Sequence, residues 1–439
     1  MARPTVAEVS LSAIRENLRA FRGLVGRGVK VLGVVKADAY GHGAARVAQA
    51  LEEAGVDQLG VALVSEGAAL REAGVRAPIL VMGSAFEDEF ADLFRYDLVP
   101  TVDDVGPARA LDRYVERERP RRGVRNAECR VKDKGASGGR SLRTPHSALR
   151  TAACHLKIDT GMNRLGIRGD EAGRQAAELA SLGHLRWQAV YTHFACAERA
   201  GHPTLGRQLG LFEQALAALR AGGVRPALVH AANSSAAVTL PGARFGMVRP
   251  GLALYGVRPC PAAGGLDLRP ALALKTRVVR VKAVPRGEGV SYGHTWTAPR
   301  DSLIGVLPIG YGDGYPRALS NRGSVRIAGR LCPIVGVVCM DATMVDLTEL
   351  AQCGMRSAEC GIAEAGSGVR GPGSGERPQT TAPIRNPQSA IRNLAGLEAT
   401  LIEPDNDSPI GAAAVARLAG TIPYEILSVL TARVPRVYV

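Results

Sequence analysis

Between residues 30 and 252, short runs rich in β-branched and other apolar residues alternate with stretches that have the apolar spacing of helices. This alternation constrains the fold strongly, because parallel strands need a crossover between them, usually a helix. Eight strands joined by helices predict an α/β fold, a (β/α)8 barrel of the TIM type. The expected strands are Val31–Val35, Gln58–Leu63, Pro78–Met82, Leu98–Val102, Cys154–Asp159, Trp187–His193, Ala227–His230 and Phe245–Arg249.

A doubly wound open sheet is the alternative fold. Its dinucleotide-binding form carries Gly-x-Gly-x-x-Gly directly after the first strand. No such run follows Val31–Val35, and this weakens the alternative. The helices expected between strands include Gly43–Ala54, Ser65–Ala73, Phe86–Phe94, Asp170–Leu182 and Thr204–Ala221.

Beyond residue 255, short β-rich runs are separated by Gly, Pro and Asn, which is the pattern of a smaller, mostly β domain. We therefore expect a barrel over 11–255 and a second domain formed by 1–10 and 256–439. Two short helices, Ala412–Leu418 and Ile422–Thr431, are expected near the end of the chain. The expected strands are Thr276–Val284, Val290–Thr297, Ser302–Pro308, Ser324–Ala328, Pro333–Met340 and Thr343–Asp346.

Two segments, 117–150 and 352–395, fit neither domain. They are rich in Gly, Arg, Ser and Pro and lack apolar periodicity, which is the composition of disordered insertions. They also resemble each other, and we interpret them as one element inserted twice, without a catalytic role. The first precedes a barrel strand and should leave from the N-terminal rim, whereas barrel active sites lie on the opposite rim.

The net charge of +14 would ordinarily suggest a nucleic-acid partner. Segment 117–150 alone holds eleven basic and three acidic residues, and segment 352–395 holds five and three, which leaves only about +4 for the rest. The basic charge therefore belongs mainly to the insertions, and no nucleic-acid partner is expected. No apolar run approaches the ~20 residues that span a membrane, and no signal peptide is recognisable, so the expected location is the cytoplasm.

Cysteine and histidine spacing gives no metal or disulfide signature. The eight cysteines include no Cys-x-x-Cys pair, and the eight histidines do not cluster at ligand spacing. His193 and His202 lie nine residues apart, and a zinc site there is not expected.

Lys36 closes the strand Val31–Val35 and is followed by Tyr40 and by glycines at 41 and 43. A lysine in this place stands at the C-terminal mouth of the barrel, where catalytic groups collect. Desolvation and neighbouring cations favour the neutral amine that forms an imine with an aldehyde cofactor. From its position alone, Lys36 could be a solvated lysine at a strand end. The phenol of Tyr40 and the closely approaching backbone of the glycines favour a cofactor, because both suit a phosphate.

The residues around Lys36, VVKADAYGHG, closely resemble the cofactor-lysine motif of bacterial alanine racemases. Further motifs of the family follow in order outside the two insertions, and nine motifs in register are highly specific. The resemblance implies pyridoxal 5'-phosphate (PLP) bound to Lys36, interconversion of L- and D-alanine, and supply of D-alanine for peptidoglycan. The further motifs are HLKIDTGMNRLG at 155–166, YTHFA at 191–195, HAANSSA at 230–236, VRPGLALYG at 248–256, GEGVSYG at 287–293, PIGYGDGYPR at 308–317, CMDATMVDL at 339–347 and TIPYEIL at 421–427.

The resemblance also assigns the cofactor contacts. Arg249 matches the arginine that faces the pyridine nitrogen, and because an arginine stays protonated it can only donate to that nitrogen. This makes the ring a weaker electron sink than an aspartate partner would. His193 matches the histidine that lies against the ring. The phosphate ligands match Tyr40, Ser234, Gly251, Leu252 and Tyr424.

Arg164 matches the arginine near the phenolic oxygen of the cofactor and the substrate carboxylate, and its planar fork suits a carboxylate. Lys157 matches a lysine that the family carries as a carbamate (N6-carboxylysine), an anion able to hold that arginine in place. From the residues alone, Lys157 pairs equally well with Asp159.

Tyr292 matches the second acid–base of the family. Racemisation removes a proton from one face of Cα and delivers one to the other, which two opposed groups do directly. The resemblance implies that Lys36 serves the D-enantiomer and Tyr292 the L-enantiomer. In the family this tyrosine reaches the site from a second subunit, together with the segment around Met340, which implies a homodimer with composite active sites.

One residue departs from the family pattern. Val337 stands where the family usually has an arginine of the substrate entrance, so the resemblance does not extend to the electrostatics of that entrance. Two alternatives remain open: a racemase of serine or of broader specificity on the same scaffold, and a non-catalytic PLP-binding barrel. Proteins of the latter kind lack the β domain, which this chain carries as GEGVSYG and CMDATMVDL. A nucleic-acid-binding module is more distant still and rests on insertion charge alone.

Overall fold

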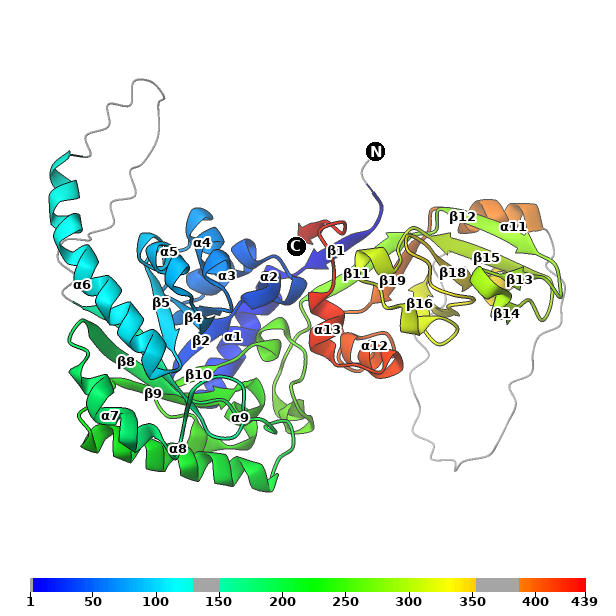
Figure 1. Ribbon diagram of the computed structural model, residues 1–439. Helices are drawn as coiled ribbons and strands as arrows, with labels where there is room; N and C mark the ends of the chain where they lie inside the picture. Colours follow the sequence, from blue (N-terminus) through cyan, green and yellow to red (C-terminus); the bar gives the residue numbers. More distant parts are fainter. Residues whose placement is uncertain (1–2, 129–150, 353–386) are drawn as a thin grey trace. The chain divides into compact units, whose positions relative to one another are not determined.

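The computed structural model describes residues 3–128, 151–352 and 387–439. The chain divides into two compact units, one of Leu11–Ala271 and the other of Met1–Ser10 with Leu272–Val439 (Figure 1). Among the described residues, no helix is both long and apolar enough to cross a membrane. The cytoplasmic location expected from the sequence stays a prediction.

Eight parallel strands of the larger unit close into a barrel, which confirms the predicted TIM-type fold. The ring closes because β5 pairs with β6 and β10 pairs with β2, and β7 (Ile167–Arg168) adds to the edge of β6. The strands are β2 (Lys30–Val34), β3 (Gln58–Val61), β4 (Ile79–Ser84), β5 (Leu98–Val102), β6 (Ala152–Asp159), β8 (Leu185–Tyr191), β9 (Leu228–Asn233) and β10 (Met247–Arg249).

Helices follow the strands and cover the barrel. In α1 the buried residues Ile14, Leu18 and Phe21 recur at helical spacing on one face. Asn17 on the same helix is buried, and its side-chain amide donates to the carbonyl oxygens of Leu254 and Arg269, which holds α1 against the end of the barrel segment. The helices are α1 (Leu11–Val25), α3 (Ala44–Glu53), α4 (Val64–Glu72), α5 (Phe90–Arg95), α6 (Val105–Glu128), α7 (Ala172–Ser181), α8 (Pro203–Ala221) and α9 (Ser234–Thr239).

The predicted insertions are only partly described. The first was expected to begin at Arg117, but α6 continues to Glu128. In the second, α10 (Thr348–Gln352) extends one residue into the segment, and α11 (Pro387–Leu394) is a helix. The rest of both segments lies outside the described residues.

The second unit is built on a six-stranded sheet of order β17-β16-β19-β11-β1-β20. A three-stranded sheet, β12-β15-β18, and the hairpin β13–β14 complete its strands in the described residues. Strand β1, near the start of the chain, lies between β11 and β20, the last strand. The strands are β1 (Val6–Val9), β11 (Leu272–Arg277), β12 (Arg280–Val284), β13 (Gly289–Val290), β14 (Trp296–Thr297), β15 (Ser302–Leu307), β16 (Ser324–Ile327), β17 (Arg330–Pro333), β18 (Thr343–Asp346), β19 (Glu398–Ile402) and β20 (Arg436–Tyr438). The helices α12 (Ala412–Ala419) and α13 (Pro423–Ser428) stand where two were expected.

Three strands predicted in this unit were wrong in extent. The expected strand Thr276–Val284 is two strands in different sheets, because the Val278 N–H donates to Leu397 and the next N–H, of Val279, donates to Val306. The expected strand Val290–Thr297 is the hairpin β13–β14. Of the expected strand Pro333–Met340, only Pro333 belongs to a strand, as the last residue of β17. Period-two apolar patterns do not reveal where a chain changes sheets.

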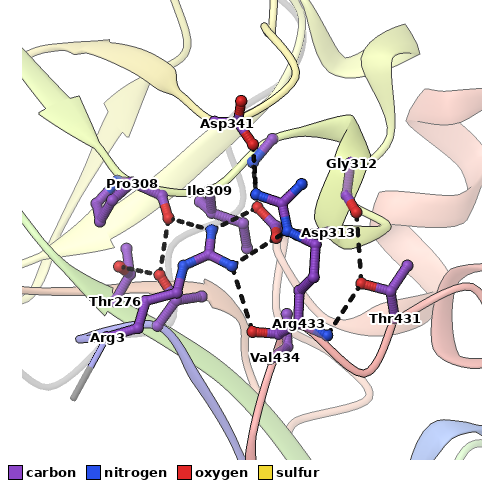
Figure 2. Close-up of polar contacts among 12 residues, drawn as sticks. Arg3, Thr276, Pro308, Ile309, Gly312, Asp313, Asp341, Thr431, Arg433 and Val434 are labelled. Carbon is purple, nitrogen blue, oxygen red and sulfur yellow. Dashed lines mark hydrogen bonds and ion pairs between the residues drawn. The ribbon is translucent and has the colours of Figure 1, made fainter.

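A buried carboxylate, Asp313, joins the two ends of the chain within the smaller unit (Figure 2). Arg3 donates to both of its oxygens at 2.6 Å, and the Gly310 N–H donates at 3.0 Å. Arg433 lies 3.2 Å from the same carboxylate and also pairs with Asp341. Burial by itself raises the pKa of Asp313, but the Arg3 and Gly310 hydrogen bonds and both guanidinium charges bring that pKa below its usual value.

We predict that Asp313→Asn lowers the free energy of unfolding by about 3 kcal/mol, because two guanidiniums lose a buried charged partner. The depressed pKa makes the charged contribution complete above pH ~4 and lost as pH falls further. Thermal unfolding at pH 7 should separate the variant from the wild type, and the gap should narrow in acid.

The matched control is Glu398→Gln, which removes an exposed carboxylate 3.4 Å from Lys275 in the same unit. This change should cost less than about 1 kcal/mol. Equal unfolding midpoints for Asp313→Asn and Glu398→Gln at pH 7 would contradict the assignment of Asp313 as the joint between the chain ends.

Candidate active site

Polar side chains gather inside the barrel at the ends of four neighbouring strands, β6, β8, β9 and β10. The strand register places Lys157 beside Tyr191 and Tyr191 beside His230. Because alternate residues of a strand share a face, β6 directs His155, Lys157 and Asp159 the same way. The described barrel thus holds basic and aromatic groups together at one level.

Arg249, at the end of β10, is 4% exposed. Its guanidinium donates to the carbonyl oxygens of Thr192 and Ala231, at 2.7 and 2.9 Å. It also lies 2.8 Å from His230 Nδ1 and 3.3 Å from His193 Nδ1. Burial lowers the pKa of Arg249 to about 10, so the side chain keeps its charge at neutral pH.

The histidines beside the buried Arg249 are neutral, so they add no second positive charge there. His230 stacks on the Tyr191 ring at 4.7 Å, and its Nε2 lies 3.1 Å from His155 Nδ1. Burial and the Arg249 charge lower the pKa of His193 and His230 well below the ordinary histidine value. The Tyr191 ring also lies 5.2 Å from the Arg249 guanidinium carbon, within cation–π range. At neutral pH the imidazoles therefore act as acceptors and apolar surfaces.

Arg164 lies on a loop that Asp159 holds in place. The Asp159 carboxylate accepts the backbone N–H groups of Gly161, Met162, Asn163 and Arg164, at 2.8 to 3.1 Å. Because this carboxylate binds the loop backbone, Asp159 does not pair directly with Lys157 and acts on it only as a longer-range attraction.

Lys157 is 6% exposed, and its Nζ lies 5.6 Å from the centre of the Tyr191 ring. Burial, Arg164 and Arg249 lower the pKa of Lys157 to about 8, against smaller opposing effects of Asp103 and Asp159. The lowered pKa favours the neutral amine more than in an ordinary lysine, and a negative charge at this position would face two arginines.

Lys36 follows β2 and begins α2 (Lys36–Gly41), whose residues Ala37 to Tyr40 have φ between 51° and 54°. Four successive non-glycine residues in the left-handed region are rare, since each costs about 1–2 kcal/mol. The turn carries Lys36 at one end and Tyr40 at the other. Burial lowers the pKa of Lys36, and so does the charge of Arg164, while Glu66 opposes both.

Tyr40, Ser234 and Gly251 form a second cluster on the same rim. Ser234 begins α9, and its Oγ accepts the Gly251 N–H at 2.8 Å. A Cβ atom on Gly251 would lie 2.5 Å from the Tyr40 hydroxyl, so only glycine permits this approach. Leu252, with its side chain buried, follows in the next turn.

The remaining predicted residues belong to the smaller unit. Tyr292 stands between β13 and β14 and is 73% exposed, and Met340 is 51% exposed. The Ser291 hydroxyl donates to the Val337 carbonyl at 2.7 Å, which brings the segments of Tyr292 and Met340 together. Tyr424, in α13, is also exposed.

Metal-binding groups are missing from the described residues, where no three His, Cys, Asp or Glu side chains converge.

Comparison with known proteins gives the family. The chain matches the family description "Alanine racemase, N-terminal domain" over residues 9–259 and "Alanine racemase, C-terminal domain" over residues 271–364. The chain belongs to the alanine racemase family.

Members of the alanine racemase family match over the whole length of the chain. The alanine racemase of Symbiobacterium thermophilum is 40% identical over 437 residues, which cover 99% of this chain and 97% of that protein. The alanine racemase from D-cycloserine-producing Streptomyces lavendulae has a TM-score of 0.79 at 31% identity, covering 100% and 98% of the two chains. That from Bartonella henselae, solved with covalently bound pyridoxal phosphate, has a TM-score of 0.76 at 25% identity and covers 100% of both chains.

Sequence reasoning missed the supporting roles of three residues of the site. His230 contacts Arg249, Asp159 anchors the Arg164 loop, and Glu66 accepts the N–H of Ala37. Asp159 stands two residues before Gly161-Met162-Asn163, and this was a visible signal, because such side chains often cap the turn that follows. The partners of His230 and Glu66 lie 19 and 29 residues away, beyond the reach of a local pattern.

We predict that Asp159→Ala frees the loop at 161–164, because four backbone N–H groups lose a charged acceptor. Hydrogen bonds to charged groups are worth about 1.5–3 kcal/mol, so amide exchange should quicken by about tenfold or more. Hydrogen exchange of the peptide containing Arg164 measures this. Asp170→Ala, which removes an exposed partner of Arg168, should leave that exchange unchanged, and equal protection in both variants would contradict the anchoring role.

Proposed function

We propose that this protein is an isomerase that interconverts L- and D-alanine with PLP bound to Lys36. The observation that carries the proposal is the setting of Lys36, a partly buried lysine at the barrel mouth whose pKa is lowered by burial and by Arg164. A lysine of this kind supplies the neutral amine that binds an aldehyde. The 40% identity to an alanine racemase over nearly the whole chain supports alanine as the substrate.

The residues on the rim fit PLP. Gly251 lies close to the Tyr40 hydroxyl and to the Ser234 hydroxyl. This cluster therefore offers backbone N–H and hydroxyl groups, which are the donors that a phosphate needs. Leu252 would add its backbone N–H, and Tyr424 a further hydroxyl. Bound there, the cofactor supplies the electron sink that acidifies the substrate Cα–H.

Arg249 would donate to the pyridine nitrogen and His193 would lie against the ring. Arg249 is already held by two backbone carbonyls, so its orientation is set before any cofactor binds. With a pKa of about 10 it donates throughout the neutral range without giving up its proton. Arg164, on its anchored loop, would bind the substrate carboxylate.

Two bases would move the proton. We assign Lys36 to the D-enantiomer and Tyr292 to the L-enantiomer, on opposite faces of Cα. The 73% exposure of Tyr292 suits a residue that acts in the site of a second copy, so we propose a homodimer with composite sites, to which Met340 also contributes. D-Alanine for peptidoglycan is the proposed product.

We predict that Lys36→Ala abolishes the visible absorbance of bound cofactor, and that borohydride reduction of the wild type traps the cofactor on Lys36. L-Alanine should racemise faster than L-serine, as followed by circular dichroism. Cofactor trapping without turnover of any amino acid would instead favour the non-catalytic PLP barrel, and serine outrunning alanine would overturn the substrate.

We predict that Tyr292→Phe slows racemisation in both directions by about 10²–10⁴-fold, the usual contribution of an acid–base group. In D2O the variant should still exchange the α-proton of D-alanine, which faces Lys36, but not that of L-alanine. Tyr96→Phe, a change at the hydroxyl partner of Glu72, is the control and should keep both activities. Unchanged exchange of L-alanine in Tyr292→Phe would contradict the two-base assignment.

We further propose that Lys157 carries a carbamate. Its neutral amine nitrogen adds to the carbon of carbon dioxide. An N–C bond forms, one C=O π bond opens to give the oxyanion, and an N–H proton leaves to solvent. The resulting anion would lie near Arg164 and Arg249. Carbamate occupancy should rise with pH through about 8, the pKa of Lys157, because the protonated amine cannot add.

Labelled bicarbonate and carbon NMR should show one carbamate signal in the wild type and none in Lys157→Ala. The exposed Lys282→Ala serves as control and should retain the signal. A signal that persists in Lys157→Ala would assign the carbamate elsewhere.

A further inference from the structure

The left-handed turn at Ala37 to Tyr40 is held mostly by its own backbone. The Ala39 N–H donates to Val35, and the Gly43 N–H donates to Asp38, at 3.0 and 2.9 Å. A strained backbone persists only where the surrounding structure holds it in place. We therefore expect the turn to need contacts beyond its own backbone bonds. A contact from outside the turn is therefore of interest.

That contact is the carboxylate of Glu66, in the first turn of α4. Its Oε1 accepts the N–H of Ala37 at 2.6 Å. Its Oε2 accepts the N–H groups of Ala62 and Leu63, at 2.7 and 3.2 Å. One side chain thus ties the residue after Lys36 to the loop that follows β3, the neighbouring barrel strand.

We propose that Glu66 is a positioning residue for Lys36, holding the left-handed turn so that the cofactor lysine and Tyr40 face the same site. This inference rests on the proposed function, since it assigns Lys36 to the cofactor. Glu66 binds three backbone N–H groups with its two oxygens, and a neutral amide at this place would turn a donor toward at least one of them.

The charge of Glu66 has a second consequence for the lysine. Burial and Arg164 lower the pKa of Lys36 and Glu66 raises it, while His193, also near Lys36, is neutral at physiological pH. Removing the Glu66 charge should therefore lower the pKa of Lys36 further. A purely structural brace would leave this titration unchanged.

The experiment compares Glu66→Gln and Glu66→Asp with the control Glu72→Gln. Glu72 lies on the same helix, and among the contacts described its carboxylate accepts only from the exposed Tyr96 hydroxyl. The first readout is hydrogen exchange of the segment 37–43 in the apo form. The second is PLP affinity, from absorbance on reconstitution. The third is the pH midpoint for borohydride trapping of PLP on Lys36.

In Glu66→Gln we expect faster exchange of 37–43, at least about tenfold weaker PLP binding, and a trapping midpoint at lower pH. Glu66→Asp keeps the charge, so its trapping midpoint should stay nearer that of the wild type. If the glutamine variant fails to fold, the aspartate variant takes its place in the comparison. Glu72→Gln should match the wild type in all three readouts.

Wild-type affinity and midpoint in Glu66→Gln would overturn the inference, even if exchange in the turn increased. Absence of trapped Lys36 in the wild type would overturn the proposed function as well. Normal trapping in the wild type together with an unaffected Glu66→Gln would overturn the inference alone.

Discussion

Burying positive charge at the mouth of a barrel is the constraint on which the rest of the site depends. Arg249 and Lys157 are almost fully buried, Lys36 is partly buried, and Arg164 adds its charge from the loop. Desolvation and mutual repulsion act in the same direction, so the lysine pKa values fall while the arginine keeps its proton. The same electrostatic field that disfavours protonated lysines favours anions, which matches a phosphorylated cofactor and a carboxylate substrate.

The nearby carboxylates do not neutralise this charge by direct pairing. Asp159 turns to four backbone amides and Glu66 to three, so both act chiefly as anchors of the loops that carry Arg164 and Lys36. Asp313 in the smaller unit differs, because it pairs directly with arginines from both ends of the chain. Asp159 and Glu66 therefore fix the geometry of the site, and the cations of the site retain their effect on ligands.

The barrel could be predicted from the sequence because its strands are short, apolar and regularly separated. Leu98–Val102 was predicted to the residue, and the other strands within a few residues. The smaller unit was harder, since β19 follows an insertion directly and the break at Val278–Val279 depends on partners far along the chain.

Residues that themselves carry chemistry, such as Lys36 and Arg249, could be singled out from the sequence as candidates, because motifs of the family surround them. Residues that support others could not. Glu66 and His230 resemble ordinary helix and strand residues until the fold brings Ala37 and Arg249 to them. The left-handed turn also went unnoticed, because Ala37 to Tyr40 contains no glycine and thus no local signal for positive φ.

The proposed site gathers a lysine of lowered pKa, a protonated arginine and a phosphate cradle around a single cofactor at one barrel mouth. A crystal structure of the protein with PLP tests this most directly. We predict continuous density from Lys36 Nζ to the cofactor, Arg249 at the ring nitrogen and the phosphate against Tyr40, Ser234 and Gly251. Density joining the cofactor to another lysine, or a phosphate placed away from Gly251, would contradict it.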